Sequence, residues 1–318
     1  MVCLSDPLVQ TISDLYHKIA ALENLDPSEE VNALFGQLVR ACIPPHPIDV
    51  SKLCAEIQET RQKLIGLCSA AEGLLESHHA AALAAFDSPL DHLHLFPYYS
   101  NYLKLSRLEL DLLLPHSPDP RRLAFIGSGP LPLTSIVLAT GHLTSSVFDN
   151  FDINPAANAA AARLVAPHPD LARRMNFHTA DVMDVPPAVL REYDVVFLAA
   201  LVGMEAEEKM QVVEHLEKSM APGAVLVVRS AHGARAFLYP VVDPRQLRGF
   251  EVLSVHHPTD EVINSVVVAR KCAAKLAAAV GKSAAAAALC SKCGEIQPFA
   301  CNPMSLVEEL AAAEEHIC

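Results

Sequence analysis

The tripeptide Gly127-Ser128-Gly129 lies between two apolar segments of different character. Residues 123–126 predict a short buried strand, and residues 131–139 predict a helix. A strand, a glycine turn and a helix start together hold a nucleotide-like ligand at the carboxyl edge of a parallel sheet, because glycine lets the backbone approach the ligand. Pro132 replaces the third glycine of the dinucleotide fingerprint, which weakens the pyrophosphate interpretation. An ordinary structural turn remains the alternative.

Carboxylates follow the next two predicted strands. Asp152 lies about 20 residues past the glycines, where a carboxylate accepts hydrogen bonds from a ribose diol. We favour it over Asp149 because it directly precedes the strand end at Asn154-Pro155; the alternative is a helix cap. Asp181 follows the third strand, where methyltransferase-like sheets meet an adenine amino group, and a cap is again the alternative. Together these signals favour S-adenosylmethionine over NAD.

The surrounding elements predict two structured domains and a tail. Residues 1–118 show helical periodicity and form an all-helical domain, which ends in a proline-rich linker at 115–120. Residues 119–270 alternate short strands with helices, which predicts a Rossmann-like α/β sheet of the methyltransferase type. The connection between the last two strands is too short for a parallel crossover, so that pair is antiparallel. The strands are expected at 123–126, 146–151, 174–178, 193–199, 224–229, 250–256 and 262–269.

Composition narrows the function classes. The chain has 318 residues, is 51% hydrophobic and carries a net charge of −13, which argues against nucleic acid and anionic membranes as partners. No apolar run is long enough to predict a transmembrane segment, and the first residues do not resemble a signal peptide. Nine cysteines without a secretory signal predict reduced thiols and a cytoplasmic location.

No metal site is expected. Cys290 and Cys293 form one closely spaced pair, but a zinc knuckle needs four paired ligands, so residues 271–318 are better interpreted as a partly disordered tail rich in alanine. Four histidines in the helical part lack a metal-ligand frame such as His-Glu-x-x-His; they are His78, His79, His92 and His94.

Five long motifs, in order, closely resemble plant nicotianamine synthases. The resemblance covers roughly residues 1–270, and one departure is Asn154, where a second acid is expected. The motifs are Phe96-Pro-Tyr-Tyr-Ser-Asn-Tyr-Leu, Ile126-Gly-Ser-Gly-Pro-Leu-Pro-Leu-Thr-Ser135, Phe148-Asp-Asn-Phe-Asp-Ile153, Phe197-Leu-Ala-Ala-Leu-Val-Gly-Met204 and Ser230-Ala-His-Gly-Ala-Arg-Ala-Phe-Leu-Tyr-Pro240.

This resemblance implies an aminocarboxypropyl transferase. Three S-adenosylmethionine molecules are condensed into nicotianamine, a chelator of iron, zinc and copper, with release of three methylthioadenosines. An amine attacks the γ-carbon of the methionine moiety, and a neutral thioether leaves. Because the sulfonium already carries positive charge, no metal is expected. The helical domain is expected to cap the sheet edge, and related enzymes suggest a homodimer.

The resemblance also assigns residues. It implies that Glu76 is the base that accepts the amine proton and that Tyr102 is its partner, although Glu72 looks equally suitable from the sequence. Without the resemblance, a solvated helix acid and a core tyrosine would be the better interpretations. Arg235 follows the fifth strand, and its guanidinium is expected there to hold a substrate carboxylate; a surface salt bridge is the alternative. Tyr98 and Tyr239 are expected to bind substrate.

Tyr102-Leu-Lys-Leu105 also matches a tyrosine-based sorting pattern. Vesicle association therefore stands as an open expectation beside a cytoplasmic location. Such four-residue patterns occur constantly by chance.

Overall fold

The computed structural model describes residues 6–46 and 48–273, which fall within one compact unit. The tail from residue 274 onward, including Cys290 and Cys293, lies outside the described residues.

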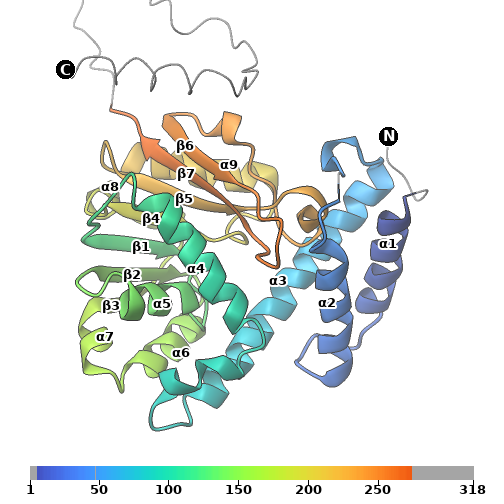
Figure 1. Ribbon diagram of the computed structural model, residues 1–318, viewed down its shortest axis with the longest axis horizontal. Coiled ribbons are helices and arrows are strands. Elements are labelled where there is room, and N and C mark those ends of the chain that lie inside the picture. The colour runs from blue at the N-terminus through green and yellow to red at the C-terminus, as the bar shows by residue number, and fades with distance from the viewer. Residues whose placement is uncertain (1–5, 47, 274–318) are drawn as a thin grey trace, which may run out of the picture. The chain divides into compact units, whose positions relative to one another are not determined.

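A seven-stranded sheet runs through this unit in the order β3-β2-β1-β4-β5-β7-β6 (Figure 1). The first five strands are parallel, and the last two pair antiparallel, as predicted. Strand β7 is also antiparallel to β5. Predicted and observed bounds differ by three residues at most. The strands are β1 (Arg122–Ile126), β2 (Val147–Asp152), β3 (Met175–Thr179), β4 (Val195–Leu198), β5 (Val225–Ser230), β6 (Phe250–His256) and β7 (Ser265–Lys271).

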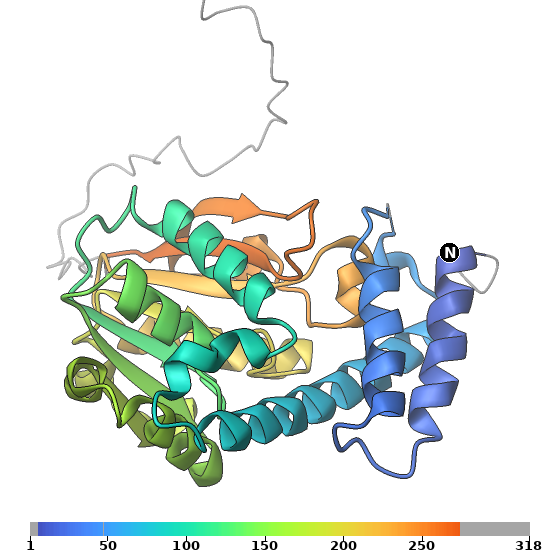
Figure 2. The same ribbon diagram turned by 60° about the horizontal axis from the view of Figure 1, so that its bottom comes forward.

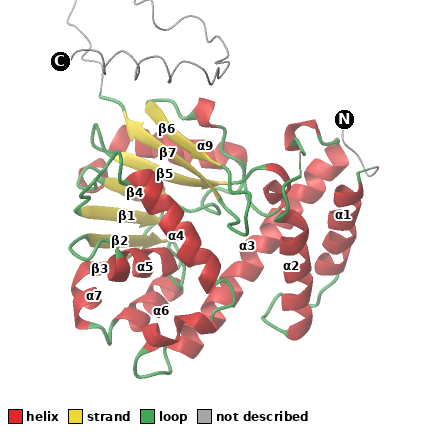
Figure 3. Ribbon diagram, viewed as in Figure 1, coloured by secondary structure: helices red, strands yellow, loops and turns green. Residues whose placement is uncertain are grey.

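Helices cover both faces of the sheet (Figure 3). Strand alternation divides the core, since Leu123 and Phe125 belong to one apolar cluster and Ala124 and Ile126 to the other. The first cluster includes side chains of α4 (Tyr99–Leu113), α5 (Leu133–Gly141), α6 (Pro155–Val165) and α7 (Pro169–Arg174), and the second those of α8 (Pro187–Leu190) and α9 (Ala206–Ser219). The short helix α7 was not predicted.

The N-terminal part is helical, as predicted, with somewhat different ends. Helix α1 (Pro7–Ala20) is capped by Asp6, and α2 (Glu29–Cys42) by Ser28. In the turn between them, the side chain of Asn24 accepts a hydrogen bond from the amide of Asp26. The 3₁₀ turns are η1 (Val50–Lys52), η2 (Pro89–Leu95), η3 (Val182–Asp184), η4 (Gly233–Phe237) and η5 (Pro244–Gln246).

Helix α3 (Ala55–Leu83) connects the helical part to the sheet (Figure 2). It is about 43 Å long at 1.5 Å per residue. Its first half packs in a third apolar cluster with α1, α2 and η4, whereas Ala80 and Leu83 near its end belong to the core under the sheet. The middle of α3 is thereby fixed from both ends. Among the described residues no helix has the length and apolarity needed to cross a bilayer.

Candidate active site

A cavity of about 770 Å³ lies between the middle of α3 and the carboxyl ends of β1, β2, β4 and β5. Eight of the ten predicted site residues line it, although the chain brings them from six separate segments. They are Glu76, Tyr102, Gly127, Ser128, Gly129, Asp152, Asp181 and Tyr239.

The glycine turn is built as the sequence predicts. Gly127 and Gly129 have φ of 77° and 67°, values that side-chain-bearing residues rarely adopt. A Cβ on Gly127 would lie 2.3 Å from Cγ2 of Val202, so the backbone runs against the loop after β4. Helix α5 begins at Leu133 rather than 131, which makes Pro132 its N-cap.

The Asp152 carboxylate is held by this turn. Its Oδ2 accepts a hydrogen bond from the amide of Gly129 at 2.8 Å, and its Oδ1 accepts one from the amide of Asn154 at 2.9 Å. The cap of α6 is Asn154, whose side chain accepts from Ala156, so the helix-cap interpretation of Asp152 is wrong. Asp181 lines the cavity and also caps η3, because its Oδ1 accepts from the amide of Met183 at 2.9 Å.

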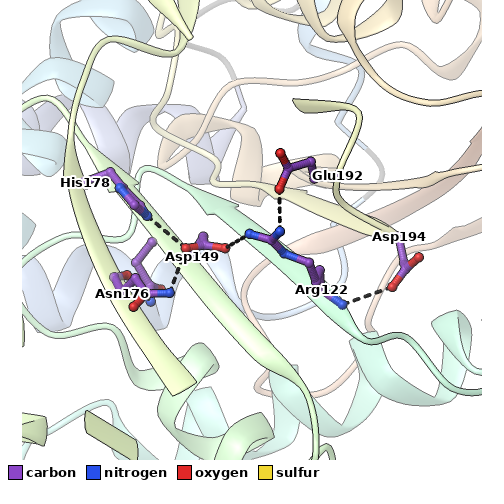
Figure 4. Close-up of polar contacts among 7 residues, drawn as sticks. Arg122, Asp149, Asn176, His178, Glu192 and Asp194 are labelled. Atoms are coloured by element: carbon purple, nitrogen blue, oxygen red, sulfur yellow. Dashed lines mark hydrogen bonds and ion pairs between the residues drawn. The ribbon is translucent and has the colours of Figure 1, made fainter. Parts of the chain in front are cut away.

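Asp149 belongs to a different polar network (Figure 4). It lies three residues before Asp152 in β2, so the two side chains point to opposite faces of the sheet. Its buried carboxylate accepts from Arg122 at 3.1 Å and from Asn176 at 2.9 Å, and its Oδ1 lies 2.8 Å from Nε2 of His178. Arg122 also pairs with Glu192. This network ties β1, β2 and β3 together outside the cavity, which agrees with the choice of Asp152.

Two carboxylate–phenol pairs form the opposite wall. Tyr102 donates to Oε1 of Glu76 at 3.1 Å, and Tyr239 donates to Oε2 of Glu72 at 2.9 Å. Burial raises the pKa of Glu76 well above its ordinary value, and the neighbouring Glu72 charge raises this pKa further. Burial likewise raises the pKa of Glu72, and it keeps both phenols protonated by raising their pKa values. Each carboxylate is therefore a stronger base than a solvated one.

The cavity is acidic. Five acidic side chains and one basic side chain, Arg229, occur among the described lining residues. Arg229 is already paired, since its Nε and Nη2 donate to the two oxygens of buried Glu109 at 2.7 and 3.0 Å, and Nη2 also donates to Thr134. Burial lowers the pKa of Arg229, but the charge and hydrogen bonds of Glu109, together with the neighbouring Tyr102 and Glu72, outweigh burial and raise that pKa overall. The uncompensated carboxylates favour a ligand that carries positive charge.

Comparison with known proteins identifies the family. The family model described as "Nicotianamine synthase protein" matches residues 3–276. The chain belongs to the nicotianamine synthase family.

Members of this family from several plants are similar over most of the chain. Nicotianamine synthase of Solanum lycopersicum is 58% identical over 99% of this chain and 100% of its own. Nicotianamine synthase 9 of Hordeum vulgare is 60% identical over 84% of this chain and 79% of its own. A crystal structure of a mutant of MtNAS in complex with S-adenosylmethionine has a TM-score of 0.70 at 24% identity, covering 84% of this chain and 99% of that one. This last likeness shows the shared fold.

Two of the predicted substrate-binding residues, Arg235 and Tyr98, do not line the main cavity. Arg235 donates to the backbone carbonyls of Pro258 and Asp260, at 2.8 and 2.5 Å. This geometry favours a role in holding the β6–β7 loop over contact with a substrate carboxylate. Tyr98 instead lines a neighbouring cavity of about 180 Å³, whose wall also includes Glu72, Glu76 and Tyr102.

The sequence reasoning missed the buried Arg229–Glu109 pair. Arg229 itself was a signal in the sequence, because an arginine at the end of an otherwise apolar predicted strand indicates a buried acidic partner. Its partner lies 120 residues away on α4, so no local spacing could have supplied it. Asn264 was also missed; it lines both cavities, and its buried amide nitrogen has no partner among the described residues.

Proposed function

We propose that this chain synthesises nicotianamine by condensing three S-adenosylmethionine molecules and releasing three methylthioadenosines. The observation that carries this proposal is the Glu76–Tyr102 pair facing the same cavity as the Gly127-Ser128-Gly129 turn. A nucleotide-binding turn and a buried base in one chamber suit a reaction in which an amine displaces a thioether from a sulfonium. Family membership supports the same reaction.

The proposed chemistry needs proton removal and orientation. A free amine is mostly protonated at neutral pH, and its lone pair must be released before it attacks the γ-carbon. Glu76, whose pKa is raised by burial, takes this proton, while the Tyr102 hydroxyl fixes the carboxylate. The N–Cγ bond forms as the Cγ–S bond breaks, and the electron pair moves to sulfur.

We assign the remaining substrate-binding roles from the position of each residue around the cavity. Gly127, Ser128 and Gly129 approach the nucleotide with their backbone, Asp152 accepts from the ribose, and Asp181 lies where the adenine amino group is met. Tyr98 and Tyr239 contact substrate at the other end. Residues 1–118 act as a helical domain that caps the sheet domain at 119–270.

The metal requirement, the link to metal homeostasis, the location and the oligomeric state are also proposals. We expect transfer without a metal, because the sulfonium is already activated, so a chelator should leave the rate unchanged. The product's amines and carboxylates bind iron, zinc and copper, which connects the chain to metal homeostasis. We further expect a cytoplasmic homodimer, with vesicle association as an additional possibility to be tested by imaging.

Mass spectrometry of the purified full chain incubated with S-adenosylmethionine alone tests the reaction. The expected products are nicotianamine and methylthioadenosine, because one compound serves as donor and acceptor. S-adenosylhomocysteine formed after addition of an acceptor would instead indicate a methyltransferase. Tight binding without product would contradict catalysis and favour a sensor.

A further inference from the structure

Glu72 and Tyr239 repeat the arrangement of Glu76 and Tyr102. Glu72 lies one helical turn before Glu76, so both carboxylates point from the same face of α3. Each has its own phenol, and the two phenols come from different parts of the chain: Tyr102 from α4 and Tyr239 from just after η4. The two pairs are therefore independent structures that face one chamber.

The Glu72 carboxylate has an unused acceptor. Its Oε2 is bonded by Tyr239, and the described residues offer no hydrogen bond to Oε1. The nearby cation, Arg229, is already engaged bidentately by Glu109. Glu72 is half-buried, and one neutral donor compensates its carboxylate only in part, so a cationic ligand would complete its pairing. An ammonium group has the charge and the donors that this site lacks.

The positions of the two carboxylates differ along the chamber. Glu76 lies against the glycine turn, because a Cβ placed on Gly129 would lie 2.7 Å from its Oε2. Glu72 is four residues, about 6 Å, away from Glu76 along α3. Both line the second cavity of about 180 Å³ with Tyr98, Tyr102 and Tyr239. Because the donor is held at the glycine turn, the amine of every acceptor must reach the same γ-carbon, and Glu72 would engage the ammonium of a longer acceptor on the side of that carbon away from the turn.

We propose that Glu72 and Tyr239 form a second proton-accepting pair, which binds the ammonium of the elongated acceptor and removes its proton in a later transfer than the one served by Glu76. This inference rests on the proposed function. In that transfer the ammonium gives one proton to Glu72, its nitrogen attacks the γ-carbon, and the Cγ–S electron pair leaves with neutral methylthioadenosine. Glu72 returns the proton to water when product leaves.

Product stoichiometry after Glu72→Gln tests the pair. The full-length variant is incubated with S-adenosylmethionine, and methylthioadenosine, nicotianamine and shorter aminocarboxypropyl products are quantified by mass spectrometry. We expect methylthioadenosine release to continue, the shorter product to accumulate, and the ratio of methylthioadenosine to nicotianamine to rise at least ~10-fold above three, because loss of a general base slows its own step. Tyr239→Phe should shift the ratio in the same direction by less.

The controls separate this inference from the proposed function. Glu59→Gln, an exposed acid of the same helix, should leave both rate and ratio unchanged. Calorimetric binding of S-adenosylmethionine and thermal unfolding show whether Glu72→Gln is folded. A folded Glu72→Gln variant that keeps a ratio of three, or that releases no methylthioadenosine, would overturn the second pair. Wild-type protein that makes no nicotianamine would instead overturn the proposed function.

Discussion

The Tyr102 hydroxyl lies 3.1 Å from Oε1 of Glu76, although the two residues belong to different helices and are 26 positions apart. Glu76 is 8% exposed and Tyr102 is partly buried in the same wall. Because the hydrogen bond to the phenol stabilises the charged carboxylate while burial destabilises it, the carboxylate is held ready to accept a proton. This relationship underlies the proposed chemistry and its first test.

Glu76→Gln should abolish transfer while leaving the fold intact. The amide keeps the shape of the side chain but cannot take a proton, so methylthioadenosine formation should fall by about 10²- to 10⁴-fold. S-adenosylmethionine binding, measured by calorimetry, should change little. Full activity would remove Glu76 from the mechanism, and Glu59→Gln serves as the exposed control on α3.

The same substitution should stabilise the ligand-free protein. A carboxyl whose pKa is raised in the folded state holds its proton longer there than in the unfolded chain, so stability falls as pH rises above the unfolded pKa. Glu76→Gln removes this loss, and its unfolding midpoint at pH 8 should rise by about 2 °C or more. An unchanged midpoint would mean that the buried charge is compensated in another way.

Gly129→Ala should lower activity more than its effect on stability explains. The new Cβ would lie 2.7 Å from Oε2 of Glu76, and the residue already has a positive φ. The matched control is Gly223→Ala, because Gly223 also has a positive φ but no atom within 4 Å of the added Cβ. Both variants should lose about 1–2 kcal/mol of stability from backbone strain. In rate assays, Gly129→Ala alone should be impaired; equal rates would contradict a tight approach of this turn to Glu76.

Removing one member of the Arg229–Glu109 pair should destabilise the fold strongly. Arg229→Met leaves Glu109, which is fully buried, without its counter-charge, and such losses are typically about 3–5 kcal/mol. The double variant Arg229→Met with Glu109→Leu should recover most of this, because no unpaired charge remains. Urea unfolding of the two single variants and the double variant measures the coupling. Additive losses would show that the pair is not the stabilising unit.

Buried Lys209 should make the free energy of unfolding of the protein depend on pH. Its ammonium lies 3.0 and 2.9 Å from the carbonyls of Ala199 and Ala200, and burial lowers its pKa to about 7. Between that value and its ordinary pKa near 10.5 the unfolded chain binds the extra proton, so the free energy of unfolding should rise with pH across this window. Lys209→Met should flatten the rise in urea titrations between about pH 6 and 10. If the free energy of unfolding of Lys209→Met rises with pH as steeply as that of the wild type, another group causes the pH dependence.

The local sequence determined much of the fold. The change from helical to strand–helix alternation at residue 121 indicated the sheet, and the short connection before residue 262 indicated its antiparallel end. The glycine turn was also predictable, because Gly127 and Gly129 mark a backbone conformation that few other residues adopt. The family followed from long motifs rather than from periodicity.

Tertiary structure alone decided which side chains meet. Glu72 and Glu76 look alike in the sequence, but each acquires its own phenol from a distant element. Arg235 has the expected residue type, yet its guanidinium is bound to a loop, while Arg229 lines the cavity. Periodicity fixes which face of a helix or strand a residue occupies. The packing of elements far apart in the chain sets its partner, its burial and therefore its pKa.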